Sequence, residues 1–476
     1  MAASLRVGVA LASMTQPAWV CRVLEHVRSK HTLAQLIPVP ETPCERESPA
    51  MRLFHRMDDA IYGRAADGLT PCDATPYVAG VPTAVQRVDV VLAFAPCEPA
   101  AAEVWTIHRN DALTEATVRA GEKVIARTTA MPDAISRRRA MSRLGLRTAA
   151  MLQHALDGYG NRIPSRPIGP ISPIGPMEMG LMGPMGLMGR MVYGYAQRKV
   201  RDRFTHGQWS IAFSFDPAAI AALDFRRFHH VVPPRDRLWA DPFVVADGDR
   251  AWVFLEEMLY AEDRGVISVM EVRRDGTWSQ PRRILERPYH LSYPCVFRWN
   301  GGWCMVPESG GNRTVELYRC VEFPYRWEPQ TVLMPDVHAV DTTLFEAHGR
   351  WWMFYATDSG DAAGFDRLWL HFADTPLGPW TPHPANPLEC DVIGGRPGGR
   401  PFVHQGKLVR AGQIGAPWYG HAIQLRELVT LTPDHWEERE VARITPDWAP
   451  GSSGTHTLNA DGGVMVVDAV RERWGI

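Results

Sequence analysis

The sequence feature that most constrains the fold is a repeated pattern in the second half of the chain. Five segments after residue 230 share a polar or proline-containing start, a short strand, a turn at glycine or aspartate, and a second apolar strand. Alternating apolar and polar residues between tight turns are typical of antiparallel β-strands. The segments are ADPFVVADGDRAWVFLEE from Ala240, SYPCVFRWNGGWCMVPES from Ser292, VDTTLFEAHGRWWMFYAT from Val340, GRPFVHQGKLVRAGQ from Gly399 and GTHTLNADGGVMVVDAV from Gly454.

The spacing of these segments predicts a β-propeller. One position near the start of each segment (241, 294, 341, 400 and 456) is separated from the next by 53, 47, 59 and 56 residues, a repeat length that suits one four-stranded blade. We therefore predict an all-β propeller of five blades over residues 201–476, with the first strand of each blade lining the central axis. The blade starts, which should meet at one end of that axis, are Asp241, Pro294, Asp341, Arg400 and His456.

The first half of the chain has a different pattern. Short apolar stretches alternate with helical ones, which indicates a small parallel α/β domain of Rossmann type over residues 1–160. Residues 161–200 are rich in Pro, Gly and Met without periodicity and are predicted to be a linker. We expect strands at Leu5–Leu11, Thr32–Val39, Val88–Ala95 and Val104–His108, and helices at Pro17–Ser29 and 134–158.

Composition excludes several functional classes. Lys and Arg total 51 and Asp and Glu 53, a net charge of −2 that gives no basis for binding nucleic acid. No apolar run reaches the roughly 18 residues of a membrane span, and no signal peptide is recognisable. The eight cysteines form no CxxC pair. We expect a cytoplasmic protein without metal or cofactor; the arginine-rich helix at 134–158 is either a solvated face or a peripheral membrane contact.

Carboxylates near the blade starts are the candidate catalytic residues. Asp241, Glu308 and Asp341 should converge at the axis, with Glu256 and Glu257 at the end of the second strand of blade one. Glycosidic chemistry uses one ionised carboxylate and one carboxyl group kept protonated. We therefore predict catalytic roles for Asp241, Glu308 and Asp341. The alternative, that these acids only hydrogen-bond the strand starts, stays open.

Other polar residues near the blade starts fit a ligand pocket. Arginine suits phosphate or carboxylate groups, while His, Asn and Gln suit sugar hydroxyls, so the set predicts a sugar with an anionic group. The tryptophans either stack on sugar rings or fill the core between blades; they are Trp239, Trp303, Trp351, Trp352 and Trp418. The predicted substrate-binding residues are Glu257, His290, Ser292, Tyr293, Arg396, Arg400, Gln413, Tyr419, His456 and Asn459.

The second half contains, in this order, the motifs WADPF, FLEE, HLSYP, VPES, VDTTLF followed by GRWWMFY, HPANPL, RPGGRPF, YGHAIQL and GTHTLN. Over roughly residues 208–472 they resemble the propeller of the family named for the amino-terminal domain of glucosamine inositolphosphorylceramide transferase. That domain is similar to the five-bladed propellers of glycoside hydrolase family 43. In the plant members a glycosyltransferase domain follows the propeller, and we expect none after Ile476.

The resemblance implies a carbohydrate-active protein. We expect a glycosyl-transferring enzyme that acts on a glycolipid or an activated sugar in envelope glycoconjugate synthesis. Its partner would be a sugar nucleotide, a glycolipid or a glycan. Two alternatives stay open: a glycoside hydrolase of the family 43 type, and a non-catalytic glycan-binding module.

The first half resembles a shortened formyltransferase domain. RVGVALASMTQPAWV is similar to the first strand and helix of that fold, and VWTIHRND to the segment with its catalytic Asn-x-His. This chain has Thr106 where the Asn is expected and keeps only His108. Formyl transfer needs oxyanion donors and a proton shuttle, so we predict a degenerate domain.

Overall fold

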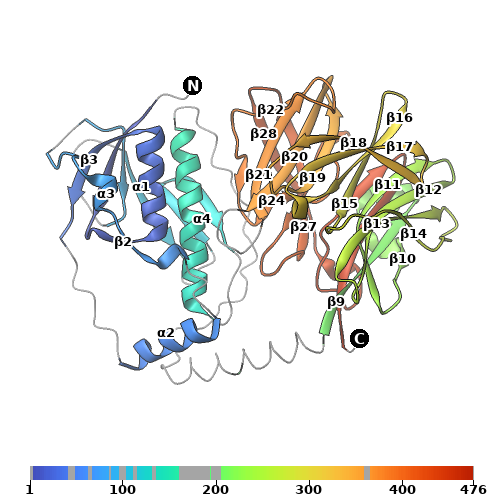
Figure 1. The fold of residues 1–476 in the computed structure, drawn as a ribbon, viewed down its shortest axis with the longest axis horizontal. Coiled ribbons are helices and arrows are strands. Elements are labelled where there is room, and N and C mark those ends of the chain that lie inside the picture. The colour runs from blue at the N-terminus through green and yellow to red at the C-terminus, as the bar shows by residue number, and fades with distance from the viewer. Residues whose placement is uncertain are drawn as a thin grey trace. The chain divides into compact units, whose positions relative to one another are not determined.

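A computed structural model describes residues 4–40, 49–62, 67–84, 87–95, 103–110, 115–130, 136–159, 193, 205–358 and 365–474 (Figure 1). The chain divides into two compact units, one up to residue 200 and one from residue 201 onward, residues 359–363 apart. Apart from Tyr193, the predicted linker at 161–200 lies outside the described residues.

The described part of the first unit contains a six-stranded mixed sheet in the order β3-β1-β5-β6-β7-β8. The first four strands are parallel, as predicted, but β7 and β8 form an antiparallel hairpin that the sequence analysis did not identify. The strands are β1 (Arg6–Leu11), β3 (Thr32–Pro38), β5 (Val90–Ala93), β6 (Glu103–Arg109), β7 (Glu115–Ala120) and β8 (Lys123–Thr129). A short pair, β2 (Thr15–Pro17) and β4 (Pro71–Asp73), lies apart from this sheet.

The helices of the first unit are α1 (Ala18–Lys30), α2 (Pro49–Tyr62), α3 (Thr75–Val78) and α4 (Arg137–Asp157). Helix α1 buries Val20, Val23, Leu24 and Val27, whose spacing forms one apolar face. In the part of the chain that the structure describes, none of the helices combines the length and the apolar composition that a bilayer-spanning segment needs.

The mixed sheet does not test whether this unit resembles a formyltransferase domain. That resemblance stays a prediction. Thr106 and His108 both lie on β6, two residues apart and therefore on the same face of the strand. Their side chains share a hydrogen bond of 2.9 Å between Oγ1 and Nε2.

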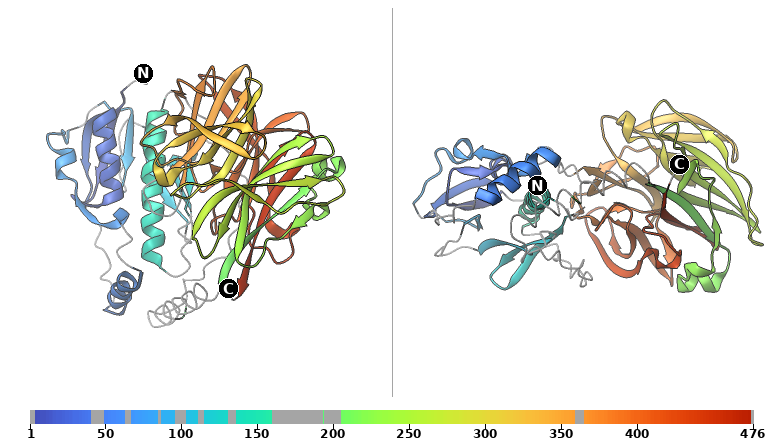
Figure 2. Two further views of the ribbon diagram at one scale, coloured as in Figure 1. Left: turned by 45° about the vertical axis from the view of Figure 1, so that its right-hand side comes forward. Right: turned by 90° about the horizontal axis from the view of Figure 1, so that it is seen from below.

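The described residues of the second unit form five sheets around a common axis, which confirms the predicted five-bladed propeller (Figures 1 and 2). Blades one to four consist of β11 to β14, β15 to β18, β19 to β23, and β24 to β28. Blade five combines β29 and β30 with β9 and β10, so both ends of the unit meet in one sheet: Ser214 pairs with Met465, and Gly207 with Glu472. This closure by β9 and β10 was not predicted.

The strands of the first two blades are β11 (Arg237–Asp247), β12 (Arg250–Leu259), β13 (Arg264–Arg273), β14 (Arg282–Leu285), β15 (Ser292–Trp299), β16 (Gly302–Glu308), β17 (Val315–Glu322) and β18 (Arg326–Met334). Those of blades three and four are β19 (Val340–Ala347), β20 (Arg350–Asp358), β21 (Phe365–Ala373), β22 (Thr381–Pro382), β23 (Glu389–Cys390), β24 (Ile393–Pro397), β25 (Phe402–His404), β26 (Lys407–Ile414), β27 (Ala422–Leu431) and β28 (Trp436–Ile444). Blade five contains β29 (Leu458–Asp461), β30 (Val464–Trp474), β9 (Thr205–Ser214) and β10 (His229–Val231), and helix α6 (Pro217–Ala222) follows β9.

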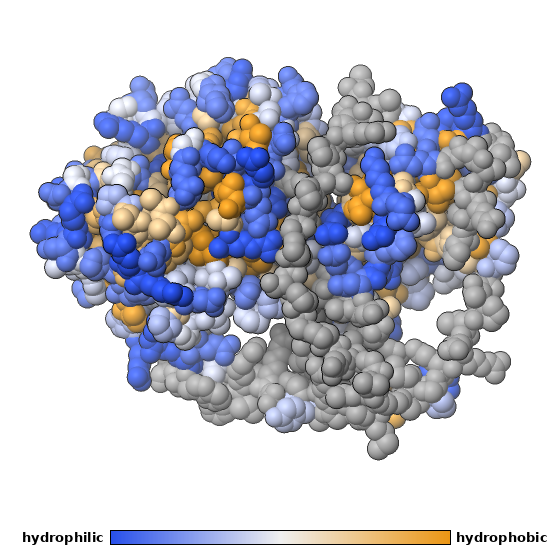
Figure 3. All heavy atoms as spheres, turned by 180° about the vertical axis from the view of Figure 1, so that it is seen from behind, coloured by the Kyte–Doolittle hydropathy of each residue, from blue (hydrophilic) through white to orange (hydrophobic). Residues whose placement is uncertain are grey.

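Figure 3 shows charged and polar side chains over much of the visible face, with smaller apolar patches between them. Large apolar side chains exposed in the propeller include Val403, Trp418 and Tyr419. Most of the other aromatic side chains pack within and between the blades.

Candidate active site

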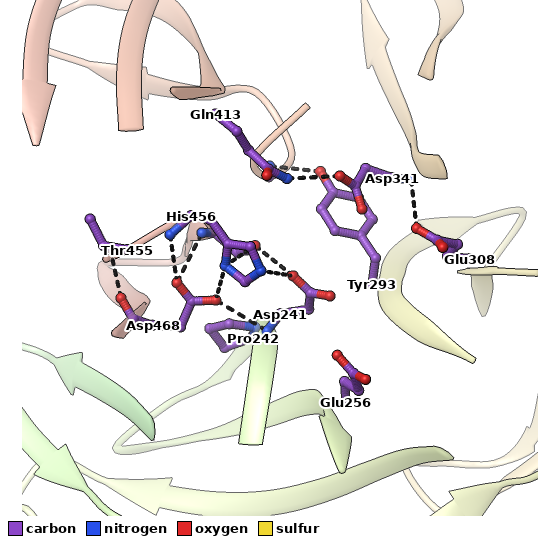
Figure 4. A network of polar contacts seen from close by, with 12 residues as sticks. Asp241, Pro242, Glu256, Tyr293, Glu308, Asp341, Gln413, Thr455, His456 and Asp468 are labelled. Carbon is purple, nitrogen blue, oxygen red and sulfur yellow. Dashed lines mark hydrogen bonds and ion pairs between the residues drawn. The ribbon is translucent and has the colours of Figure 1, made fainter. Parts of the chain in front are cut away.

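Bulges in the inner strands bring acidic side chains to the axis. In each of the first four blades the pairing of the inner strand with its neighbour is interrupted near the start of the inner strand. The residues there have positive φ: 50° at Asp241, 45° at Tyr293, 51° at Asp341 and 86° at Gly394. Bulges of this kind redirect side chains. They aim Asp241 and Asp341 into one end of the axis (Figure 4).

Two predicted blade starts need correction. In blade two the bulge residue is Tyr293, one residue before the predicted Pro294. In blade four it is Gly394, because the sequence GGRP occurs twice in succession and the inner strand contains the first copy. The predicted Arg400 belongs to the second copy and follows the strand. In blade five, His456 lies two residues before β29.

Asp241 shares a hydrogen-bond network with blade five (Figure 4). The Thr457 hydroxyl donates to Oδ1 of Asp241 at 2.7 Å, and Nε2 of His456 lies 3.6 Å from the same oxygen. Oδ2 of Asp468 accepts the N–H of Asp241 at 3.3 Å and lies 2.6 Å from Nδ1 of His456. All four side chains are buried, so the network joins the first and last blades in a site of low dielectric.

Asp341 is held by blades two and four. Nε of Arg396 donates to Oδ2 of Asp341, and Nε2 of Gln413 donates to the same oxygen at 2.7 Å. The N–H of Asp341 donates to Oε2 of Glu308 at 3.1 Å, and Nη2 of Arg396 lies 4.0 Å from that oxygen. The guanidinium therefore pairs most closely with Asp341, and the main partner of Glu308 is a neutral backbone N–H.

Burial and neighbouring charges separate the protonation states of these groups. Burial, reinforced by the Asp341 carboxylate, raises the pKa of Glu308 to about 8. Burial also raises the pKa of Asp241 to about 7, although the charge of His456 opposes this shift. Burial lowers the pKa of His456, but Asp468 and Asp241 outweigh it and raise that pKa to about 9. Near neutral pH the site therefore holds a protonated Glu308 and a cationic His456.

The two adjacent glutamates of β12 have different surroundings, because successive strand residues point to opposite faces. Oε1 of Glu256 lies 3.1 Å from Nε2 of His290, whose Nδ1 accepts the N–H of Gly265 at 2.9 Å. Glu256 and the predicted His290 thus pair beside Asp241 (Figure 4 labels Glu256). The predicted Glu257 is instead buried and accepts hydrogen bonds from Arg237, Trp239 and Ser268.

Tyr293 and Asn459 connect blades. The Tyr293 hydroxyl accepts the N–H of Gly399 at 2.6 Å and shares a 2.8 Å hydrogen bond with the Thr343 hydroxyl. Nδ2 of Asn459 donates to the carbonyl of Pro242 at 2.8 Å, and its Oδ1 accepts the N–H of Arg400 at 2.7 Å. These hydrogen bonds satisfy the polar atoms of both side chains within the protein. Tyr293 and Asn459 therefore connect neighbouring blades.

Among the remaining predicted residues, Tyr419 and Ser292 lie near the carboxyl groups and Arg400 does not. The Arg396 guanidinium lies 5.0 Å from the ring centre of Tyr419, and Ser292 pairs with Glu308 in the sheet. Nη1 of Arg400 donates to the carbonyl of Val296 at 2.8 Å, and Nη2 lies 3.7 Å from Asp461. The two predicted arginines thus have different partners: Arg396 pairs with Asp341, and Arg400 contacts Val296 and Asp461.

The sequence left two roles open for the five tryptophans, packing in the core or stacking on a ligand. Trp239, Trp351 and Trp352 are buried in the cores of the blades. Trp303 stacks on Phe323 at a ring distance of 5.1 Å. Only Trp418 of the five is exposed to any large extent, at 48%. It follows that Trp418, next to Tyr419 in the sequence, is the one of these five whose ring is exposed enough to stack on a ligand.

The sequence analysis missed three residues of the site. Asp468 and Thr457 complete the network around Asp241, and Trp209 of β9 stacks on the His456 ring at 4.0 Å. Asp468 had a recognisable signal, because it is an acidic residue inside the apolar strand VMVVDAV. Trp209 had none, because its position depends on pairing between the two ends of the unit.

Two groups of described residues have the composition of metal ligands. In Asp241, His456 and Asp468 the coordinating atoms are already engaged: Nδ1 of His456 bonds Oδ2 of Asp468, and Oδ1 of Asp468 accepts two backbone N–H groups. In the first unit, Nε2 of His26 and of His31 lie 2.9 and 3.1 Å from one oxygen of Asp157. Hydrogen bonding therefore accounts for both groups.

The fold and the site together define a five-bladed β-propeller with a buried acidic network at one end of its axis. Residues 229–453 match the family model of "Glucosamine inositolphosphorylceramide transferase 1, N-terminal". The larger part of the propeller therefore resembles that family, as its motifs predicted.

Curated relatives carry the same name. The chain is 33% identical over 204 residues to glucosamine inositolphosphorylceramide transferase 1 of Oryza sativa subsp. indica, and 33% identical over 206 residues to the protein of that name from Arabidopsis thaliana. Each alignment covers 42% of this chain and 27% of the relative. The matched region thus corresponds to about a quarter of the relatives' length.

Solved structures show more distant likenesses. A family 117 glycoside hydrolase of Zobellia galactanivorans is 13% identical, with a TM-score of 0.37 over 56% of this chain and 90% of that one. A thermostable family-43 glycoside hydrolase is 12% identical, with a TM-score of 0.37 over 50% of this chain and 89% of that one.

Proposed function

We propose that the propeller is a glycosyl-transferring enzyme that acts on a glycolipid or an activated sugar in envelope glycoconjugate synthesis. The observation that carries this proposal is the pairing of Glu308, whose pKa is raised to about 8, with the buried Asp241, whose pKa is lower at about 7. Carboxyl groups whose environments push their pKa values apart supply the acid and the base of glycosidic chemistry.

Each group then has a distinct role. Glu308 donates its proton to the oxygen of the leaving group. Asp241 acts as the base, or as the nucleophile, through Oδ2, which accepts no hydrogen bond from the described residues. Asp341, held by Arg396 and Gln413, places negative charge beside Glu308 and so favours its protonated form.

The site offers more acceptors than donors. Oε1 of Gln413 is buried and has no hydrogen-bond partner among the described residues, and it belongs to the side chain that bonds Asp341. A ligand with hydroxyl or ammonium groups would satisfy it, whereas the anionic sugar expected from two arginines would not. The name of the relatives, which includes glucosamine and a phosphorylated lipid, fits an amino sugar and a glycolipid.

A hydrolase would use the same groups, with water in place of the sugar or lipid acceptor. Incubation of the full chain with sugar nucleotides and lipid extracts, followed by mass spectrometry, separates the two reactions. Transfer predicts a glycosylated lipid that is lost in Glu308→Gln, and hydrolysis predicts only free sugar. If Asp241→Asn, Glu308→Gln and Asp341→Asn all retain full turnover, the propeller is a glycan-binding module and the proposal fails.

A further inference from the structure

Asp468, on β30, is the centre of the contacts that hold His456. Its Oδ1 accepts the N–H groups of His456 and Thr457 at 2.8 and 3.0 Å. Its Oδ2 lies 2.6 Å from Nδ1 of His456 and 3.3 Å from the N–H of Asp241. Asp468 is completely buried. Four N–H donors thus converge on its two oxygens.

The surroundings of His456 suit an imidazolium. Trp209 stacks on the ring at 4.0 Å with an interplanar angle of 20°, and Tyr419 contacts it edge-on at 5.5 Å. A cation over an indole face gains electrostatic stabilisation. With Nδ1 donating to Asp468, Nε2 is directed at Oδ1 of Asp241, 3.6 Å away.

We propose that Asp468 is a positioning residue that keeps His456 protonated, and that the imidazolium in turn keeps Asp241 ionised. The role of Asp241 as base or nucleophile rests on the proposed function, but the electrostatic coupling of these residues does not. When Asp241 acts as base, the proton of the acceptor hydroxyl passes to its Oδ2, and His456 keeps its own proton.

Other charged groups face this pair. Asp341 and Glu256 lie near Asp241 and favour its protonated form, as does Asp468. Glu308 interacts with Asp241 from blade two. The charge of His456 opposes these carboxylates at Asp241. His290, which pairs with Glu256, also interacts with Asp241, whereas Arg396 pairs with Asp341. Removing the charge of His456 should therefore leave Asp241 protonated at neutral pH.

The test is an NMR titration of the His456 ring in the histidine-labelled full chain, with the signal assigned by its loss in His456→Gln. We expect this ring to titrate near pH 9 in the wild type. In Asp468→Asn it should titrate at least two pH units lower, because the amide N–H donates to Nδ1 and favours the neutral ring. In the same variant, turnover should begin to fall at a pH at least one unit higher than in the wild type, because Asp241 becomes protonated at higher pH. Asp461→Asn, which alters a carboxylate bonded to the N–H of Ala246, is the matched control and should change neither.

A wild-type ring that titrates at or below pH 6.5 overturns the proposal, and this measurement decides the matter even if Asp468→Asn does not fold. An unchanged titration in a folded Asp468→Asn variant also overturns it. If the titration shifts as expected but no carboxylate variant alters any glycosyl reaction, the coupling stands and the proposed function fails. A loss of turnover without a change in the pH profile would assign Asp468 a structural role only.

Discussion

The two ends of the propeller axis differ in the way their backbone is used. At the end with Asp241 and Asp341, the inner strands bulge and non-glycine residues adopt positive φ. At the other end, the hairpins that leave the inner strands turn at pairs such as Asn300-Gly301 and His348-Gly349, in which both residues have positive φ. A non-glycine residue in this conformation costs about 1–3 kcal/mol. Positive φ at non-glycine residues therefore occurs at both ends, and the difference lies in the side chains that it directs: at the bulged end they include the acidic Asp241 and Asp341.

The cavity and the chemistry also lie at different ends. A cavity of about 490 Å³ is lined by Phe297, Glu346 and Asp461, at the ends of their inner strands, and by Arg400. The buried groups with shifted pKa values lie at the strand starts instead. A shifted pKa with a specific charge partner is the stronger sign of a reactive site, so the comparison assigns chemistry to the bulged end.

The largest expected effect is on activity at the bulged end. Glu308→Gln keeps the size of the side chain but removes the transferable proton, and Asp241→Asn removes the base. Acid or base assistance contributes about 10² to 10⁴ in rate, so each should lower turnover by that factor. Asp461→Asn at the other end should retain turnover. The measurement is the turnover rate of each variant on the identified substrate, with circular dichroism as the check on folding. Equal losses of turnover for variants at both ends would contradict the assignment of chemistry to the bulged end.

The next effect is on the pH dependence of stability. The pKa of Glu308 is raised from 4.5 to about 8 in the folded chain, so the folded state keeps a proton that the unfolded state releases between these values. Stability from this group is present below pH 4.5 and is lost as the pH rises to 8, by at most about 1.4 kcal/mol per pH unit. Glu308→Gln should therefore flatten the fall in melting temperature between pH 5 and 8. If the melting temperatures of the wild type and of Glu308→Gln fall in parallel as the pH rises, the raised pKa of Glu308 is contradicted.

A moderate effect is expected at the bulge of blade two. Tyr293→Phe removes the hydroxyl that accepts the N–H of Gly399 and bonds Thr343, which leaves a buried donor unsatisfied. The cost should be about 1–3 kcal/mol in the free energy of unfolding, measured by denaturant titration. Turnover should stay within a few-fold of wild type at permissive temperature. A large loss of turnover at unchanged stability would instead place the hydroxyl on the substrate.

The sequence predicted the blades better than their closure, for a physical reason. Alternation and turn residues are local, so each hairpin can be recognised by itself. The pairing of β9 with β30 joins the two ends of the unit, and no local pattern specifies that partner. The hairpin of β7 and β8 was missed because the first half was read as a purely parallel sheet.

The site shows the same limit at the level of residues. Asp241, Glu308 and Asp341 stood out as acids bordering apolar strands, and the structure brings them to one end of the axis. Asp468 had the same signal but was not selected. Arg400 was misplaced because the repeated GGRP gives two equivalent candidates, and only the backbone shows which copy forms the inner strand.

The smallest expected effect is at Arg400, which the sequence analysis predicted to bind an anionic substrate. One guanidinium nitrogen donates to the carbonyl of Val296, and another lies 3.7 Å from Asp461. A lysine can replace one such contact, so Arg400→Lys should cost about 1 kcal/mol or less and leave kcat and KM unchanged. Arg396→Lys is the matched control, because losing the fork that holds Asp341 at the bulged end should reduce turnover. If Arg400→Lys raises KM while Arg396→Lys does not, the substrate occupies the end with the cavity, and the assignment of chemistry to the bulged end is wrong.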